Sequence, residues 1–334
     1  MPDAAHVWTD KEIEKLQRDF RKVYRQASVD MRIKLGKHMR EFDAANSEWK
    51  KRVKADPSLQ KQYQDWLKTQ AANKKWIKSM TNAMIQDAVR ADQIASEHIY
   101  DTVPYVFAEN ANRAAYAIQE GVGRQIDQFA IYDQDTVRNL IAKQPDLLPN
   151  IPETHFNEKK DIAWNSQKFT SAITQSVLQG ESIPDAAKRL NVVLNMDKEA
   201  AVRAARTALT GAENAGRVHS YQRAQELGIK LEQQWLSTLD ERTRTEHRLL
   251  DGQHVPVGEK FHVPGYGEEY DIEFPGDPTA LPAMLWNCRC TLIAYFDDSP
   301  AITDDRWSRL PSGMTYNKWL KTAPKYDTKK AKNG

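Results

Sequence analysis

Residues 9–42 read TDKEIEKLQRDFRKVYRQASVDMRIKLGKHMREF, and this stretch decides the expected fold of the N-terminal part. Its apolar residues recur every three or four positions, which places them on one face of an α-helix. They are Ile13, Leu16, Phe20, Val23, Ala27, Met31, Leu35, Met39 and Phe42. Thr9 and Glu12 fit a capping box, so we expect the helix to begin at Thr9 and to run for about 35 residues or more. A helix of this length needs a partner helix or another chain to cover its apolar face.

Further helices are expected up to about residue 227. Asp56 and Pro57 suit the start of a second long helical run, which can break near Gln70 and which Pro104 ends. Shorter helices are predicted near residues 107–119, 134–143, 159–179, 183–190 and 197–227, each bounded by glycine, proline or an N-capping side chain.

Glycine is spread unevenly along the chain. Four of the 14 glycines precede residue 200 and ten follow it, which favours helices first and turns, short strands and irregular loops later. Strands are predicted at residues 231–237 and 288–296, and a turn of helix at 280–286. The expected fold class is therefore α+β: a long, mostly α-helical N-terminal part followed by a small α+β domain. The length of 334 residues agrees with about two domains.

Charge is uneven as well. The whole chain has a net charge of +2, but residues 1–90 hold 20 basic and 12 acidic residues, a local charge of +8, and the remainder has −6. The small total argues against a protein that neutralises nucleic acid along its whole length. The basic part places any DNA contact within residues 1–90. The candidate DNA-binding residues flank Trp49 and Trp76 and are Lys50, Lys51, Arg52, Lys74 and Lys75. Alternatively, these cations are solvated and the tryptophans belong to the core.

Several other classes of protein are not expected. No stretch approaches the roughly 18 uncharged apolar residues of a transmembrane helix, and the N-terminus lacks the pattern of a signal peptide. Two cysteines cannot form a disulfide scaffold, so a reducing compartment is expected. The sequence has no glycine-rich phosphate loop, no G-x-S-x-G and no H-E-x-x-H, and we expect no cofactor.

Residues 240–252, DERTRTEHRLLDG, and residues 287–290, NCRC, hold the densest group of candidate site residues. One interpretation is a zinc site, with weak candidates in His247, Cys288 and Cys290. Cysteines two apart on a strand would lie nearly 7 Å apart, whereas two sulfurs on one zinc ion can be no more than about 4.6 Å apart. The spacing therefore favours a role as small core residues, with no metal.

Two further interpretations concern the charged residues of this segment. In the first, Asp240, His247 and Asp251 hold a divalent ion or act in acid–base catalysis, as in a nuclease. In the second, Asp240, Arg242, Arg244 and Asp251 form a buried network of ion pairs and caps that fixes an irregular loop. We favour the second, because a loop-rich domain needs such contacts to satisfy its backbone.

The motifs also occur in a recognisable order. Two motifs lie on a predicted helix, Ala205-Arg206-Thr207 and Ala212-Glu213-Asn214-Ala215-Gly216. After them come Trp235, D-x-R-T-R-x-x-H at 240–247, Leu250-Asp251-Gly252, Phe274 to Pro278 and Asn287 to Cys290. Over about residues 160–296 the chain resembles the phage head morphogenesis domain of the Mu F-like minor head proteins. The resemblance gives no catalytic role to the positions that match the family, and we expect these residues to maintain the domain. They are Arg206, Asp240, Arg242, Arg244, His247, Asp251, Gly252, Asn287, Cys288 and Cys290.

This resemblance implies a domain order and a function. The expected parts are a helical region at residues 1–150, the head morphogenesis domain at 160–296 and a peripheral basic tail at 297–334. The implied protein is a non-enzymatic minor capsid protein of a tailed phage or prophage, which assists DNA packaging or ejection and binds DNA nonspecifically.

The resemblance also implies partners and a location. The expected partner is the portal protein, with double-stranded DNA, scaffold protein, major capsid protein and a second copy of the chain as further candidates and no membrane. The implied location is the capsid interior near the portal, after assembly in the host cytoplasm. Toxin domains follow this domain in some relatives, and the 44 residues after Cys290 are expected to be too few for one. The alternative function is a metal-dependent, nuclease-like enzyme centred on Asp240, His247 and Asp251.

Overall fold

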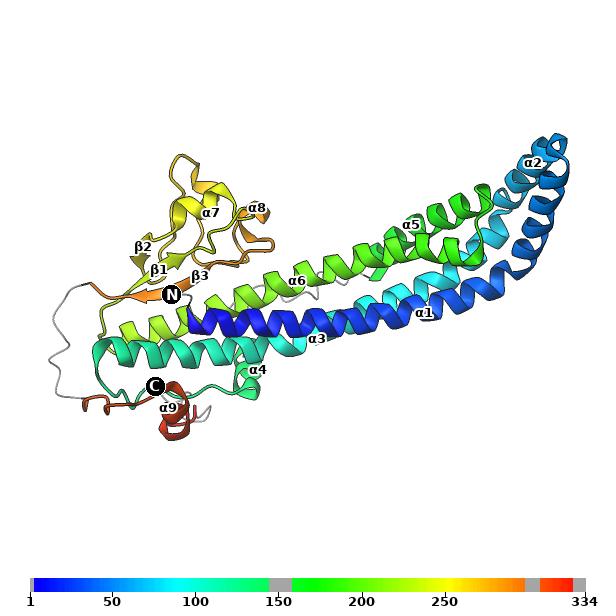
Figure 1. The fold of residues 1–334 in the computed structure, drawn as a ribbon. Coiled ribbons are helices and arrows are strands. Elements are labelled where there is room, and N and C mark those ends of the chain that lie inside the picture. Colours follow the sequence, from blue (N-terminus) through cyan, green and yellow to red (C-terminus); the bar gives the residue numbers. More distant parts are fainter. Residues whose placement is uncertain (1–2, 144–157, 298–306, 327–334) are drawn as a thin grey trace. The chain divides into compact units, whose positions relative to one another are not determined.

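The computed structural model describes residues 3–143, 158–297 and 307–326 (Figure 1). Most of them are helical, and three short strands follow the long helices, which confirms the α+β class. The helices are α1 (Ala4–Ala55), α2 (Gln60–Ala71), α3 (Lys74–Val122), α4 (Gln134–Lys143), α5 (Glu158–Leu178), α6 (Ile183–Glu226), α7 (Thr245–Leu250), α8 (Pro282–Leu285) and α9 (Tyr316–Thr322), with the 3-10 turns η1 (Pro57–Leu59) and η3 (Glu268–Tyr270). The strands are β1 (Glu232–Leu236), β2 (His254–Pro256) and β3 (Thr291–Tyr295).

The chain divides into two compact units. Unit 1 combines Met1–Lys15, His98–Pro152 and Arg203–Gly334, and unit 2 combines Leu16–Glu97 and Glu153–Val202. Helices α1, α3 and α6 therefore each contribute residues to both units. The boundary predicted between residues 150 and 160 falls largely outside the described residues, and each unit contains residues from both sides of it.

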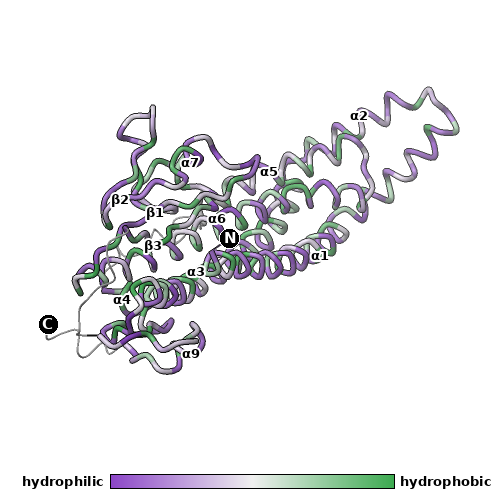
Figure 2. The backbone as a smooth tube through the Cα atoms, turned by 60° about the vertical axis from the view of Figure 1, so that its left-hand side comes forward, coloured by the Kyte–Doolittle hydropathy of each residue, from purple (hydrophilic) through white to green (hydrophobic). Residues whose placement is uncertain are grey.

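The described residues of unit 2 form helices and their connections, with no strand among them. The predicted apolar face of α1 supplies much of its core, because Phe20, Leu35 and Met39 are fully buried and Met31 nearly so. Figure 2 shows the corresponding mixture of apolar and polar positions along α1. The apolar face of α1 is thus buried, as its helical period predicts.

None of the helices in the described ranges has an apolar stretch long enough to cross a membrane.

Unit 1 contains the only sheet among the described residues. Its strands are antiparallel in the order β2-β1-β3, with Gln233 opposite Val255 and Gln234 opposite Ile293. Alternate residues of β1 face the core, as the two-residue period of a strand requires, so Gln233 and Trp235 are buried. The Trp235 side chain packs in a cluster with Phe261, among other residues.

The first helix begins earlier than the sequence predicts. Asp3 Oδ1 accepts a hydrogen bond of 2.8 Å from the backbone N of His6, which is the N-cap pattern, and α1 begins at Ala4. Thr9, the predicted cap, is buried inside the helix, where its hydroxyl donates to the carbonyl of Ala5. The sequence predicted the N-cap at Thr9 and not at Asp3, because aspartate and threonine are both favourable N-cap residues.

Two predicted breaks are absent. Pro104 lies inside α3, where it removes the hydrogen bond to the carbonyl of Tyr100. Tyr100 itself is half exposed, while the buried Val103 and Val106 hold the helix in place. The helix predicted at residues 107–119 is therefore part of α3.

Likewise, the helices predicted at 183–190 and 197–227 are one helix, α6. Asp197, the predicted cap between them, is buried within it. The chain has no glycine or proline between residues 185 and 210. Since Val193 and Leu194 continue the buried face, nothing in this stretch stops the helix.

The described part of the predicted peripheral tail packs into unit 1. Trp307 and Trp319 are only 5% and 3% exposed. Isolated bridges pair Arg124 with Arg309 and Ile131 with Lys325. Trp307 and Trp319 are therefore part of the unit 1 core, although most of the residues around them are exposed. Most of the lysine-rich run at 325–332 lies outside the described residues.

Two glycines differ in the space around them, so replacing each with alanine is expected to change the stability in opposite directions. A Cβ at Gly216 would lie 2.5 Å from the carbonyl oxygen of Phe107, whereas nothing lies within 4 Å of a Cβ at Gly36 in α1. We expect Gly216→Ala to destabilise the protein by about 1–3 kcal/mol through overpacking. We expect Gly36→Ala to stabilise it by about 0.5–1 kcal/mol, because alanine favours the helix. Denaturant unfolding measures both, and equal effects would contradict the close approach of α3 and α6 in unit 1.

Candidate functional site

A buried cluster of charges lies in unit 1 around Glu213 of α6. Glu213 is fully buried, and His6 Nδ1 lies 3.0 and 3.1 Å from its two carboxylate oxygens. Arg217 donates to Glu213 over 3.1 Å and also to Asp3, and the Thr291 hydroxyl donates to Glu213 over 2.7 Å. Burial alone would raise the pKa of Glu213, but His6, Arg217 and Thr291 outweigh it and lower the pKa. One carboxylate thus joins the start of α1, the middle of α6 and strand β3.

The same part of α6 holds the backbone of β3. Asn214 Oδ1 accepts a hydrogen bond of 2.8 Å from the backbone N of Leu292, and Arg217 Nη1 donates over 2.5 Å to its carbonyl. Glu213, Asn214 and Arg217 were not among the predicted site residues. The signal was present, because the quoted motif Ala212 to Gly216 contains the first two, but a sequence alone does not say which polar residues of a helix are buried.

Two threonines of α6 hold the segment before β3. Thr207 Oγ1 accepts a hydrogen bond of 2.9 Å from the backbone N of Asn287, and Thr210 Oγ1 donates over 3.1 Å to the carbonyl of Cys288. Asn287 has a φ of 56°, in the left-handed region that asparagine tolerates better than most residues. The chain therefore turns sharply at Asn287 and does not enter the cysteine pair as an extended strand.

Asp240 is paired mainly with Arg289, which was not a predicted site residue although it lies within the NCRC motif. The two ends of the guanidinium contact the two carboxylate oxygens at 2.5 and 2.6 Å. This pairing holds the pKa of Asp240 far below its ordinary value. Arg242, the predicted partner, is 3.8 Å away and 82% exposed, so it contributes mainly through its backbone N, which donates to Asp240 over 2.9 Å.

Other motif residues fix loops in the same way. Arg244 donates over 2.5 Å to the carbonyl of Trp286, and Asp251 accepts a hydrogen bond of 2.8 Å from the backbone N of Ser237. Gly252 has a φ of 79° and donates over 2.9 Å to the carbonyl of Trp235. Arg206 forms an ion pair with Asp10 at 3.4 Å. These contacts agree with the prediction that the charged motif residues fix loops. The residues lie at a partly exposed surface, however, and not in the buried network that the sequence predicted.

His247, Cys288 and Cys290 lie together. Each is 2% exposed, and their candidate ligand atoms all lie within 4.8 Å of one another. His247 Nδ1 is 3.3 Å from Cys290 Sγ and 3.5 Å from Cys288 Sγ. Burial raises the pKa of Cys288, while the hydrogen bond from Cys288 lowers the pKa of Cys290. The predicted separation of nearly 7 Å between the sulfurs is wrong, because β3 begins only at Thr291 and both cysteines precede it.

The residues proposed for a nuclease centre do not gather in this way. Among the described residues, the one group of three close metal-ligating side chains is His247, Cys288 and Cys290. Asp240 is bound by Arg289 and Asp251 by the Ser237 backbone, so neither carboxylate joins His247. His254 and His262 form exposed pairs with Glu232 and Asp271.

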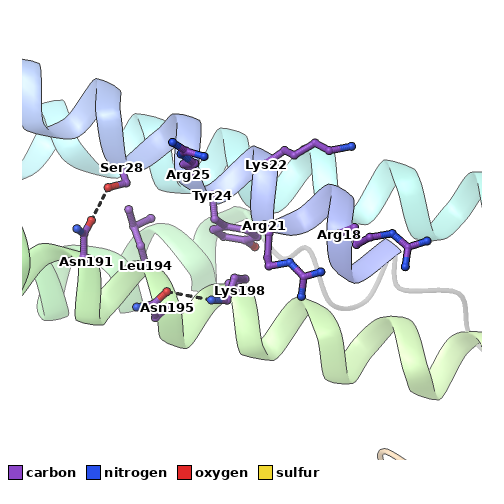
Figure 3. Close-up of a pocket in the computed structure, with 10 residues that line it drawn as sticks. All are labelled: Arg18, Arg21, Lys22, Tyr24, Arg25, Ser28, Asn191, Leu194, Asn195 and Lys198. Carbon is purple, nitrogen blue, oxygen red and sulfur yellow. Dashed lines mark hydrogen bonds between the residues drawn. The ribbon is translucent and has the colours of Figure 1, made fainter. Parts of the chain in front are cut away.

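A basic cleft of about 620 Å³ lies in unit 2 between α1 and α6 (Figure 3). Five cations and no carboxylate line it. They are Arg18, Arg21, Lys22, Arg25 and Lys198. The first four follow a spacing of three and four residues and so share one face of α1. Arg18, Arg21 and Arg25 form no ion pair with any residue that the structure describes, whereas Lys22 pairs with Asp19 at 2.7 Å.

The predicted DNA-binding residues are placed differently. Lys50 donates over 2.6 Å to the carbonyl of Gly180, and the Arg52 guanidinium lies 4.4 Å from the centre of the Trp49 ring. Lys51, Lys74 and Lys75 are exposed. Trp49 packs beside Tyr63 and Trp66, and Trp76 beside Phe42, so both tryptophans are partly buried in unit 2. Both tryptophan rings thus contact other aromatic rings of unit 2.

Comparison with known proteins identifies the class to which these motifs belong. Residues 167–293 match the family described as Phage Mu protein F like protein. This region contains Arg206, Glu213 and Arg217 of α6, the Asp240 loop and the cysteine pair. Residues 167–293 are thus similar to the Mu F-like family, and the resemblance inferred from the motifs is confirmed over this region.

Particular relatives are similar over longer or shorter stretches. Minor head protein GP7 of Bacillus phage SPP1 is 28% identical over 224 residues, which is 64% of this chain and 68% of that protein. NAD(+)--arginine ADP-ribosyltransferase EFV of Enterococcus faecalis is 25% identical over 232 residues, 68% of this chain and 46% of that protein. YqbB of Bacillus subtilis is 31% identical over 127 residues, 37% of this chain and 40% of that protein. The chain thus spans less than half of two of these relatives. No solved structure matches it.

The Glu213 cluster predicts a pH dependence of stability. Burial opposes a charge on His6, but the Glu213 carboxylate outweighs burial and raises the pKa of His6 above its ordinary 6.5. The folded protein then holds this proton more tightly than the unfolded chain. We therefore expect the free energy of unfolding of the wild type to fall, relative to that of His6→Gln, as the pH rises from below 6.5 through the pKa of folded His6.

Denaturant unfolding at a series of pH values measures this difference. His98→Gln removes an imidazole outside the cluster and serves as the matched control, which should keep the pH dependence of the wild type. Identical pH profiles for the wild type and His6→Gln would show that His6 carries no extra proton in the folded protein.

Proposed function

We propose that this chain is a minor head protein of a tailed phage or prophage, acting in head morphogenesis and incorporated into the virion. The observation that carries the proposal is the Mu F-like region at residues 167–293, together with similarity to a minor head protein over 64% of this chain. The polar contacts of this region agree with a structural role, because they bind backbone groups and fix loops.

We further propose that the protein associates with the portal protein inside the head and assists DNA packaging or ejection. Scaffold protein, major capsid protein and a second copy of the chain are the other candidate partners. The whole-protein role rests on relatives that the chain covers only in part.

DNA contact is best supported at the basic cleft of unit 2. Its five cations lie within a single concave site, and three of its arginines have no acidic partner among the described residues. The rise of 1.5 Å per residue places Arg18 and Arg25 about 10 Å apart along α1, so that adjacent phosphates of a backbone can be contacted together. In the set predicted from sequence, by contrast, Lys50 and Arg52 are already engaged within the protein.

Salt dependence tests this placement. Each phosphate neutralised on duplex DNA contributes about −0.9 to the slope of log K against log salt concentration. We expect the triple variant Arg18→Gln, Arg21→Gln, Arg25→Gln to reduce the magnitude of this slope by about 3. The matched control Lys51→Gln, Lys74→Gln, Lys75→Gln removes the same charge and should leave the slope nearly unchanged. Fluorescence anisotropy with a labelled duplex of mixed sequence measures all three proteins, and an equal loss in both variants, or no binding by the wild type, would contradict the placement.

Virion composition tests the assembly role. We expect the chain to be present in purified particles at few copies and to co-purify with the portal protein when the two are expressed together. Quantitative mass spectrometry of particles and a co-expression pull-down measure these outcomes, with the major tail protein as the negative partner. Absence of the chain from particles would contradict the proposal.

Enzymatic activity has weaker support. The name of the enterococcal relative includes arginine ADP-ribosyltransferase, but this chain spans 46% of that protein. The nuclease alternative is not favoured either, because Asp240 and Asp251 do not join His247 in a group of close metal-ligating side chains among the described residues.

A further inference from the structure

We propose that His247, Cys288 and Cys290 bind one Zn²⁺ ion, through His247 Nδ1 and the two Sγ atoms. Imidazole nitrogen and thiolate sulfur are the ligands that zinc prefers, and three such protein ligands leave one position of the tetrahedral ion for a further donor. The proposal concerns a site of the Mu F-like region and does not depend on the proposed function.

The distances agree with coordination of one ion. Tetrahedral zinc with Zn–S of about 2.3 Å and Zn–N of about 2.1 Å places a ligand nitrogen and sulfur about 3.5 Å apart. The observed separations from His247 Nδ1 are 3.3 Å to Cys290 Sγ and 3.5 Å to Cys288 Sγ. All three atoms lie within 4.8 Å of one another, so both sulfurs and the nitrogen can surround one position with little movement.

The backbone holds both cysteines in this arrangement. The left-handed turn at Asn287 directs the chain into the pair, and Thr210 fixes the carbonyl of Cys288. The backbone N of Cys290 donates to Cys288 Sγ over 3.3 Å. Such a donor stabilises a thiolate as well as a thiol.

The histidine is positioned as firmly. His247 lies in α7, its carbonyl accepts a hydrogen bond of 2.6 Å from the Ser237 hydroxyl, and its ring packs edge-on against Trp235. The ring nitrogen that faces the two sulfurs is Nδ1, and the described residues supply no partner for Nε2. A core built only for packing would not need to place a histidine ring nitrogen against two thiols.

The location gives the ion a structural task. The residues between β1 and β3 form only short helices and one short strand, so regular backbone hydrogen bonds hold them weakly. An ion bound to α7 and to the segment before β3 would join the two ends of this stretch. Because all three ligands are 2% exposed, the ion would be bound as the region folds.

Zinc content tests the proposal directly. The full chain is expressed in zinc-supplemented medium and purified without chelators or a metal-affinity tag. Plasma mass spectrometry should find about one zinc per chain in the wild type, and less than about a tenth of that in Cys288→Ala, Cys290→Ala. The matched control His254→Ala, His262→Ala removes two exposed histidines and should keep the zinc. Zinc that persists in the cysteine variant, or a wild type that neither contains zinc nor takes it up stoichiometrically, would overturn the proposal.

A second readout applies if the cysteine variant fails to fold. Wild-type protein refolded with Co²⁺ should show thiolate-to-cobalt charge-transfer absorption in the near ultraviolet, and Zn²⁺ should displace it. His247→Cys keeps a soft ligand at the same position and should retain the metal. Absence of the cobalt band from folded wild-type protein would contradict thiolate ligation.

Discussion

The carboxylate of Glu213 has no access to water, and the arrangement of unit 1 depends on how its charge is balanced. A buried carboxylate is costly unless hydrogen-bond donors and opposite charges surround it. His6, Arg217 and Thr291 supply these from α1, α6 and β3. Because the three elements are distant in sequence, one electrostatic requirement brings the start of the chain and its last strand to the same helix.

The loops of the Mu F-like region follow from this anchor. Asn214 holds Leu292 of β3, and Thr207 and Thr210 hold the turn before it. That turn sets Cys288 and Cys290 beside His247, while Arg289 between them reaches Asp240. The motifs are therefore parts of one set of contacts between α6 and an irregular segment, and the basic cleft of unit 2 is a separate feature with its own chemistry.

Much of the secondary structure could be predicted, and much of the site geometry could not. The buried face of α1, the helix at 134–143 and the two five-residue strands β1 and β3 follow from period and turn residues alone. The predictions at Thr9, Pro104 and Asp197 were wrong. Each residue is a local signal for a helix cap or break, but packing of the buried face continues the helix through it. The cysteine separation was wrong because the strand starts three residues later than predicted. Three features depend on contacts between residues distant in sequence, which no local pattern encodes. They are the burial of Glu213, the pairing of Asp240 with Arg289 and the basic cleft.

Hydrogen exchange of wild type and Glu213→Gln tests the central role of this carboxylate most directly. Removing one partner from a buried ionic cluster costs about 3–5 kcal/mol, which exceeds the cost of a local rearrangement. We expect faster amide exchange in three places together: the first turns of α1, the middle of α6 and strand β3. Exchange that rises only around residue 213, with the start of α1 and β3 protected as in the wild type, would contradict the claim that this carboxylate holds unit 1 together.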